Sequence, residues 1–488
     1  AITLTGSTIE QINVRAHGGP DTIDVHDLAG SGVKQVSVDL AATGGETGDG
    51  AIDTVNIGDP GLAHNYTFAA AGAVINVGGL AERVTVTNAE FADRVVINGA
   101  GRDDTLTLTG AATGQVFFAD VNGTHATAGF DQAKVEVSGI ANVLLQGGAG
   151  GDTMIGSNGV GTLTHFTFDG GGGDDSLVGT DGGDNLIGGA GDDLIQGGRG
   201  NDTVAMGSGV DTFAWSPGDG SDSIDGGSGL DTVQFNGANI AETFDLATSG
   251  VGFQFTRNVA AITMTGASVE TLDVLARGGP DSITLHDLTG SGIRQVAIDL
   301  AGIAGTGAGD AAADTVAVVG STLSDRVTIT GSGGAVTVAG LTETVTLSAA
   351  EIGDLLSLDG GDGNDVVNAA GMAAGQIRLQ LIGGAGDDTL SAGHGDDSLT
   401  GGSGDDRFSF GPQTGHDLVT DFQAHGSGLH GDVVALSGFV DHTFAAALAN
   451  HHIVQSGANV DITDGANVIV TLANVTLATL HANDFLFT

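Results

Sequence analysis

Twelve aspartates recur at one position of a nine-residue repeat, and their carboxylates are the groups in this chain best suited to chemistry. The repeats match the pattern Gly-Gly-x-Gly-x-Asp-x-apolar-x, and all twelve copies have aspartate sixth and an apolar residue eighth. Glycine turns let backbone carbonyls crowd beside a carboxylate, and these hard oxygens are the ligands that Ca²⁺ prefers. The twelve predicted metal ligands are Asp152, Asp175, Asp184, Asp193, Asp202, Asp211, Asp222, Asp231, Asp365, Asp388, Asp397 and Asp406.

The spacing predicts how these aspartates are stacked. Two repeats make one solenoid turn of about eighteen residues, so aspartates two repeats apart fall on the same edge. Asp193 would then lie between Asp175 and Asp211. Without an ion, neighbouring carboxylates repel each other, so folding and calcium binding are expected to be one event. The copies at Asp152 and Asp365 are isolated, and the sequence shows no stacking partner for them.

Composition supports a calcium-dependent chain over other classes. The 488 residues include 87 glycines, no cysteine, and 60 acidic residues against 13 basic ones, and nine of the 60 are glutamate, leaving 51 aspartates. A net charge of −47 argues against nucleic acid or an anionic membrane as partner. No run of about 18 apolar residues indicates a transmembrane segment.

The elements that must position the aspartates are short strands. Stretches such as residues 33–40 and 83–87 alternate apolar and polar residues and are bounded by Gly, Asp or Asn, which is typical of β-strands. Their passage into nine-residue repeats predicts an all-β fold, a parallel β-helix or β-roll solenoid stapled by calcium.

Residues 1–40 return as residues 261–300, so the chain contains a duplicated module. We expect a first solenoid segment at 1–146 and a first nonapeptide β-roll at 147–234. A linker and second solenoid segment, repeating 1–98, follow at 235–359. A second β-roll at 360–409 and a C-terminal β cap at 410–488 complete the chain.

The repeats resemble the repeats-in-toxin (RTX), or haemolysin-type, calcium-binding family of bacterial secreted proteins. The resemblance implies multiple Ca²⁺ ions and export through a type I system, with a secretion signal within 410–488 and folding outside the cell. It also implies a protein of the cell surface or extracellular space.

Other motifs are expected to be structural. Turns at Asp21, Asp104 and Asp281 depart from the repeat through a proline or a lost glycine, which favours metal-free turns. Histidines cluster after residue 390, but their spacing matches no compact zinc or copper motif, so we interpret them as polar cap residues.

Three function classes remain open. The favoured one is a non-enzymatic calcium-binding structural protein of a surface layer, filament or matrix, which associates with itself and meets cell-surface polysaccharide. An alternative is the carrier portion of a secreted toxin, adhesin or enzyme whose active domain lies before Ala1. The third is a polysaccharide-modifying enzyme with a groove on the β-helix face, which the single Trp and single Tyr make less favoured.

Overall fold

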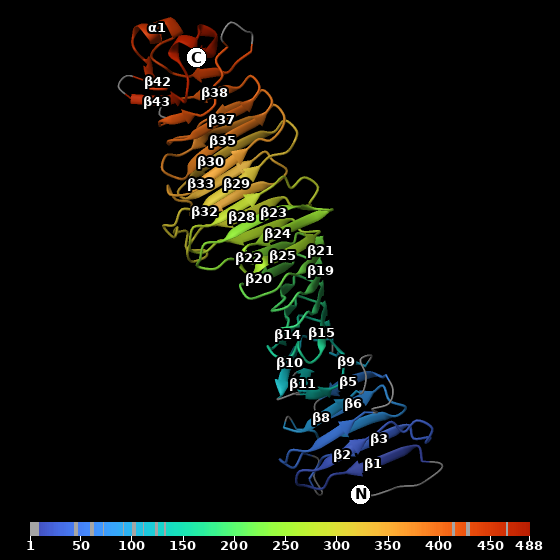
Figure 1. The fold of residues 1–488 in the computed structure, drawn as a ribbon. Coiled ribbons are helices and arrows are strands. Elements are labelled where there is room, and N and C mark those ends of the chain that lie inside the picture. Colours follow the sequence, from blue (N-terminus) through green and yellow to red (C-terminus); the bar gives the residue numbers. More distant parts are fainter. Residues whose placement is uncertain are drawn as a thin grey trace. The chain divides into compact units, whose positions relative to one another are not determined.

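The computed structural model describes twelve stretches of the chain, which are residues 9–42, 47–58, 63–71, 73–90, 92–99, 104–110, 112–122, 125–130, 133–411, 415–425, 430–464 and 467–488. The chain divides into two compact units, Ala1–Thr232 and Val233–Thr488. Within each unit, short strands stack in parallel like rungs and alternate between two sheets (Figure 1). The predicted parallel β-solenoid is confirmed.

The first unit opens with three parallel strands on each sheet. Alternating side chains are buried because valine and isoleucine occupy every second position of each strand, as in Val36 and Val38. A three-stranded antiparallel excursion interrupts the winding before the next turn. The strands on the two sheets are β1 (Gln11–Arg15), β3 (Gln35–Asp39) and β7 (Arg83–Thr87), and β2 (Thr22–Val25), β4 (Thr54–Ile57) and β8 (Arg94–Asn98). The excursion consists of β5 (Asn65–Ala71), β6 (Val74–Gly78) and β7.

A second excursion precedes the nonapeptide repeats, where the strands shorten and glycine turns join them. Leu177 pairs with Ile195 on one sheet and Leu186 with Val204 on the other. The second excursion comprises β10 (Val116–Asn122), β11 (His125–Phe130) and β12 (Ala133–Ser138), and β9 (Thr105–Thr109) pairs with β13. The nonapeptide strands are β13 (Asn142–Ala149), β15 (His165–Gly172), β17 (Asn185–Ala190), β19 (Thr203–Gly209) and β21 (Ser223–Gly229), facing β14 (Thr153–Gly156), β16 (Ser176–Val178), β18 (Leu194–Gln196) and β20 (Thr212–Trp215).

The eighth residue of each repeat forms a narrow core. Leu177, Leu186, Ile195 and Phe213 are fully buried, and Val204 is 2% exposed. These eighth-position side chains fill the space between the two sheets, whose strands here are as short as the three residues of β16 and β18. The predicted apolar ladder is therefore confirmed.

The second unit repeats the winding of the first. Gln11 pairs with Gln35 in the first unit, and Thr271 pairs with Gln295 at the matching positions of the second. The antiparallel excursion also recurs. The first sheet of the second unit has β23 (Thr243–Ser249), β24 (Gly252–Arg257), β25 (Ile262–Ala267), β27 (Ser282–Leu285), β29 (Thr315–Val319), β33 (Leu355–Asp359), β35 (Arg378–Ala385), β37 (Ser398–Ser403) and β39 (Asp417–Val419). Its second sheet has β26 (Thr271–Leu275), β28 (Gln295–Asp299), β30 (Arg326–Ser332), β31 (Ala335–Ala339), β32 (Thr344–Ser348), β34 (Val366–Met372), β36 (Thr389–Ser391), β38 (Arg407–Phe410) and β40 (Val433–Leu436). Strand β22 (Thr232–Asn236) spans the division between the units, and a 3-10 turn (Val259–Ala261) precedes β25.

The C-terminal cap is rich in β-strands, as predicted, and also contains one short helix. Strands β43 and β44 extend the two sheets by pairing with β39 and β40. Helix α1 begins after Thr443, whose side chain accepts a hydrogen bond from the Ala446 amide. The cap elements are α1 (Phe444–Ala449), β41 (Ile453–Ser456), β42 (Asn459–Asp464), β43 (Asn467–Leu472), β44 (Phe485–Phe487) and 3-10 turns at Leu477–Thr479 and Ala482–Asp484.

Among the described residues, no helix is long and apolar enough to cross a membrane.

Candidate calcium-binding ladders

The nonapeptide turns need glycine because successive turns touch backbone to backbone. Gly191, at the fourth position, has φ of +132°. A side chain there would be strained and would also collide with the Gly173 carbonyl oxygen of the preceding turn. The glycines thus bring carbonyl oxygens of adjacent turns close to the aspartates.

The sixth-position aspartates form ladders of hydrogen bonds that run from turn to turn. Oδ1 of Asp193 accepts from the Asp175 amide at 2.8 Å, and Oδ1 of Asp211 accepts from the Asp193 amide at 2.8 Å. On the other edge, Oδ1 of Asp202 accepts from the Asp184 amide at 2.8 Å. The predicted eighteen-residue register is confirmed. In each step, the backbone amide of one aspartate donates to the carboxylate of the aspartate one turn further on. The sequence analysis did not predict this contact.

The second carboxylate oxygen of these residues is buried and accepts no hydrogen bond. A methyl group on Gly188 would collide with Oδ2 of Asp193 and with the Met206 carbonyl oxygen of the next turn. An anionic oxygen and a backbone carbonyl therefore converge beside the first-position glycine. The atoms in this condition include Oδ2 of Asp175, Asp193, Asp202, Asp211, Asp365 and Asp388, and Oδ1 of Asp184.

A buried anionic oxygen with no donor is costly, and a hard cation would satisfy it. In the described part of the chain, no three Asp, Glu or His side chains gather closely enough to hold a metal by themselves. Backbone carbonyls must therefore complete the coordination, which the glycine-rich turns permit. The residues present fit Ca²⁺, which accepts carboxylate and carbonyl oxygens together.

Burial changes the protonation of these aspartates. It raises the pKa of Asp202 to about 8 and that of Asp222 to about 7. It also raises the pKa values of Asp175 and Asp193 to about 6, and repulsion from neighbouring aspartates adds to the effect. Hydrogen bonds from backbone amides act in the opposite direction. A bound cation would favour the ionised form, so calcium binding should release protons.

A second ladder at the fifth position was missed by the sequence analysis. The amide of Asp192 donates to Oδ1 of Asp174 at 2.9 Å, and the amide of Val210 donates to Oδ1 of Asp192 at 2.8 Å. Its bonds point toward the N-terminus, opposite to the sixth-position ladder. Asp or Asn recurs at this position, which is the signal that could have revealed it; the members are Asp174, Asp192, Asn201, Asn364, Asp387, Asp396 and Asp405.

The isolated copies also stand in ladders. The Asp152 amide donates to Asp175 at 2.6 Å, and the Asp365 amide donates to Asp388 at 2.7 Å. Both steps span 23 residues, because these turns carry five more residues than a pair of repeats. That longer turn hid the partners in the sequence.

The remaining predicted ligands lie in the same kind of contact. Asp222 and Asp231 accept from Asp202 and Asp211. Asp397 donates from its amide to Asp417, and Asp406 donates to Asp432. All twelve predicted aspartates are thus buried members of sixth-position ladders. Which of them are calcium ligands stays a prediction.

The ladders continue beyond the repeats. The Asp21 amide donates to Asp53 at 2.8 Å, and the Asp281 amide donates to Asp314 at 2.8 Å. Asp104 accepts from the His64 amide at 2.7 Å. The turns expected to lack metal therefore use the same carboxylate-to-amide bond, which shows that the bond itself does not require the repeat.

Histidines of the C-terminal region pair with individual aspartates. Nδ1 of His425 lies 2.8 Å from Asp484, and Nδ1 of His452 lies 2.5 Å from Asp441. His430 lies 2.7 Å from Asp405. These contacts fit the interpretation of the histidines as polar cap residues.

The match to a family of calcium-binding repeats agrees with the geometry. The RTX calcium-binding nonapeptide repeat matches residues 139–163, 169–204, 178–213, 218–237, 357–371 and 380–411, and these ranges contain all twelve predicted aspartates. Extracellular lipase LipA from Serratia marcescens matches in structure with 19% sequence identity and a TM-score of 0.18, over 64% of this chain. This chain spans 40% of the lipase chain. No curated protein matches in sequence.

The nonapeptide matches fall on the two blocks where glycine turns, buried aspartate ladders and the apolar ladder coincide. RTX nonapeptide repeats bind Ca²⁺ in multiple copies, and the oxygens present in both blocks fit that ion. The chain thus carries RTX calcium-binding nonapeptide repeats in two blocks, within residues 139–237 and 357–411.

Proposed function

We propose that this chain is a secreted, non-catalytic calcium-binding structural protein of the bacterial cell surface or extracellular matrix. Calcium would drive the nonapeptide blocks to fold and would allow folded solenoids to associate into a layer or filament. The observation that carries the proposal is the ladder of buried carboxylates, which runs through repeat and non-repeat turns of each unit alike. A chain built of such turns is suited to stiffness.

Calcium-dependent folding of the nonapeptide blocks also fits export of the chain from the cell. With calcium scarce inside the cell, the unneutralised carboxylates of the nonapeptide blocks would oppose folding, and calcium outside would promote it. Nonapeptide blocks that stay unfolded in the cell and fold outside it fit type I secretion of RTX proteins.

Electron microscopy tests the structural role. The purified chain in millimolar calcium should form lattices or filaments that disperse when a chelator is added and return when calcium is restored. Particles that stay monomeric across calcium and protein concentrations would contradict assembly, while leaving calcium-driven folding to be judged by circular dichroism.

A second candidate function is recognition of a cell-surface polysaccharide, and a groove in the second unit favours it. The groove encloses about 570 Å³ and is lined in part by Arg378, Asp396, His416 and Asp461. Thr471 joins two of these, because its hydroxyl lies 2.9 Å from Nε2 of His416 and donates to Asp461 at 2.8 Å. Such convergent polar groups suit sugar hydroxyls.

Binding of surface polysaccharide to the calcium-loaded chain tests this candidate. Replacing Arg378 with Gln should weaken binding several-fold, whereas Arg407→Gln, outside this groove, should not. Equal binding by both variants and the parent chain would exclude the groove as the sugar site.

A further inference from the structure

The turn at residues 237–242 in the second unit has the architecture of a nonapeptide turn, although it carries glutamate at the sixth position. A methyl group on Gly237 would lie 2.5 Å from the Ala276 carbonyl oxygen and 2.8 Å from Oε2 of Glu242. The first-position glycines of the repeats meet the same two kinds of oxygen. The Glu242 amide also donates to Oδ1 of Asp281 at 2.8 Å, as in the aspartate ladders.

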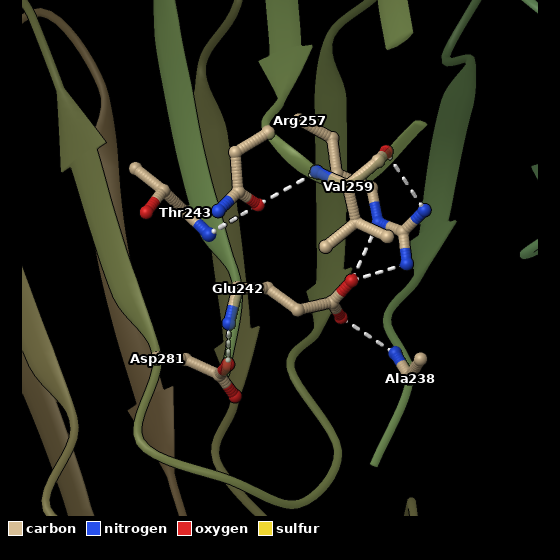
Figure 2. A network of polar contacts seen from close by, with 7 residues as sticks. Ala238, Glu242, Thr243, Arg257, Val259 and Asp281 are labelled. Atoms are coloured by element: carbon tan, nitrogen blue, oxygen red, sulfur yellow. Dashed lines mark hydrogen bonds and ion pairs between the residues drawn. The ribbon is translucent and has the colours of Figure 1, made fainter. Parts of the chain in front are cut away.

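The difference lies in how the carboxylate is satisfied. Oε2 of Glu242 accepts from the Ala238 amide at 2.6 Å. Oε1 accepts from Nε of Arg257 at 2.6 Å and is also paired with Nη2 of the same guanidinium (Figure 2). The side chains of Glu242 and Arg257 are 0% and 3% exposed. Asp193 and the other repeat carboxylates named with it above keep one buried oxygen without a hydrogen bond, whereas Glu242 has both oxygens bound.

Arg257 is positioned by the β23–β24 hairpin, which the nonapeptide repeats lack. It ends β24, which pairs antiparallel with β23, and Phe244 lies opposite it. Its Nη1 donates to the Val259 carbonyl at 3.2 Å, which fixes the orientation of the guanidinium. Because an arginine stays charged at every physiological pH, this cation is permanent and independent of the solvent.

We propose that Arg257 is a built-in counter-ion that takes the place of calcium at this turn. The turn at 237–242 therefore closes in calcium-free solution, whereas the nonapeptide turns close when calcium binds. Glutamate suits this position because its longer side chain reaches the guanidinium, and the guanidinium satisfies the oxygen that an ion would otherwise bind.

This ion pair gives the second unit a folding seed, the turn at 237–242, that forms without calcium. The Glu242 amide joins the seed to Asp281, whose amide joins Asp314, whose amide in turn joins Asp354 at 3.0 Å. Each of these turns leads into a strand with a buried apolar residue, as at Ile283 and Val316. Residues 237–359 should accordingly stay ordered when the nonapeptide blocks have lost their ions.

Hydrogen exchange on the full chain, followed by mass spectrometry with and without chelator, tests the proposal. In the parent chain, amides of 238–246 should stay protected in chelator while amides of 175–213 exchange freely. Arg257→Gln should quicken exchange of 238–246 in chelator by roughly a hundredfold or more, because it leaves a buried carboxylate without its cation. Arg277→Gln is the matched control, since that guanidinium bonds the Asn236 side chain and not Glu242.

Two results would overturn the proposal. One is simultaneous loss of protection at 238–246 and at 175–213 when the parent chain is chelated, and the other is unchanged exchange in Arg257→Gln. If Arg257→Gln does not fold, the double variant E242Q/R257Q decides, because it removes both charges. Protection restored in the double variant supports a counter-ion role, and protection still absent contradicts it.

Discussion

The backbone amide of Asp193 donates to Oδ1 of Asp211, 2.8 Å away and one turn further along the first unit. Asp193 accepts the same bond from Asp175 and keeps its other oxygen without a hydrogen bond. One side chain thus serves two separable purposes, since Oδ1 holds the turns together and Oδ2 is available to an ion.

Two substitutions of Asp193 should separate these purposes. Asp193→Asn keeps an acceptor for the Asp175 amide but removes the charge, so the first block should need more calcium to fold. Asp193→Ala also orphans the buried amide and should cost a further ~1–3 kcal/mol in excess calcium. Thermal unfolding across a calcium titration measures both effects, and identical behaviour of the two variants would contradict the division of roles.

Gly188, at the first position of its repeat, should be hard to replace for a reason that the third-position Gly172 does not share. A methyl group on Gly188 collides with two oxygens that face the proposed ion, so Gly188→Ala should lower calcium affinity at least tenfold. Gly172→Ala is the control, because a methyl group there lies 3.9 Å from the nearest atom. That variant should be neutral or more stable by about 0.4–1 kcal/mol. Calcium titration by calorimetry compares them, and equal losses would refute the steric explanation.

Acid should stabilise the calcium-free chain. In the folded state, burial raises the pKa of Asp202 to about 8 and those of Asp222 and Asp281 to about 7, above the usual value near 3.8 of the unfolded chain. The folded state therefore binds more protons, and its stability is greatest at low pH and falls as the pH rises through 6 to 8. Between pH 8 and pH 5 we expect a gain of several kcal/mol in chelator.

Urea unfolding at the two pH values checks this prediction. Excess calcium should reverse the trend, since protons then compete with the ion for the same carboxylates. A calcium-free chain that loses stability between pH 8 and pH 5 would show that other groups govern its acid response.

The narrow core should tolerate no truncation at the eighth position. Leu186 is fully buried between the two sheets, so Leu186→Ala should cost about 2–5 kcal/mol in calcium. Leu194, at the seventh position of a neighbouring repeat, is 45% exposed, and its replacement by Ala should cost well under half as much. Denaturant unfolding in excess calcium distinguishes the two positions, and equal costs would mean that the eighth residue is not the core.

The sequence predicted the structural features that depend on residues recurring at fixed positions of the repeat. Aspartate at the sixth position and an apolar residue at the eighth, as in Asp184 and Leu186, set the turn length, the edge and the inward face. The partner of Asp152 was not predicted, because a turn of 23 residues breaks the period. The fifth-position bonds of Asp174 and Asp192 were missed because each joins a side chain to the backbone of another turn. Such a contact becomes visible only once the turns are stacked.

The bond between Asp193 and Asp211 also bears on how chains of this kind can change length. Where the repeats are contiguous, each sixth-position aspartate bonds its counterpart 18 residues away, on the same edge. Gain or loss of two consecutive repeats by recombination leaves every such bond intact, whereas gain or loss of one repeat shifts all later aspartates to the opposite edge. Nonapeptide blocks should therefore evolve in pairs of repeats, and the two blocks of this chain can differ in length without any change in how their turns are joined.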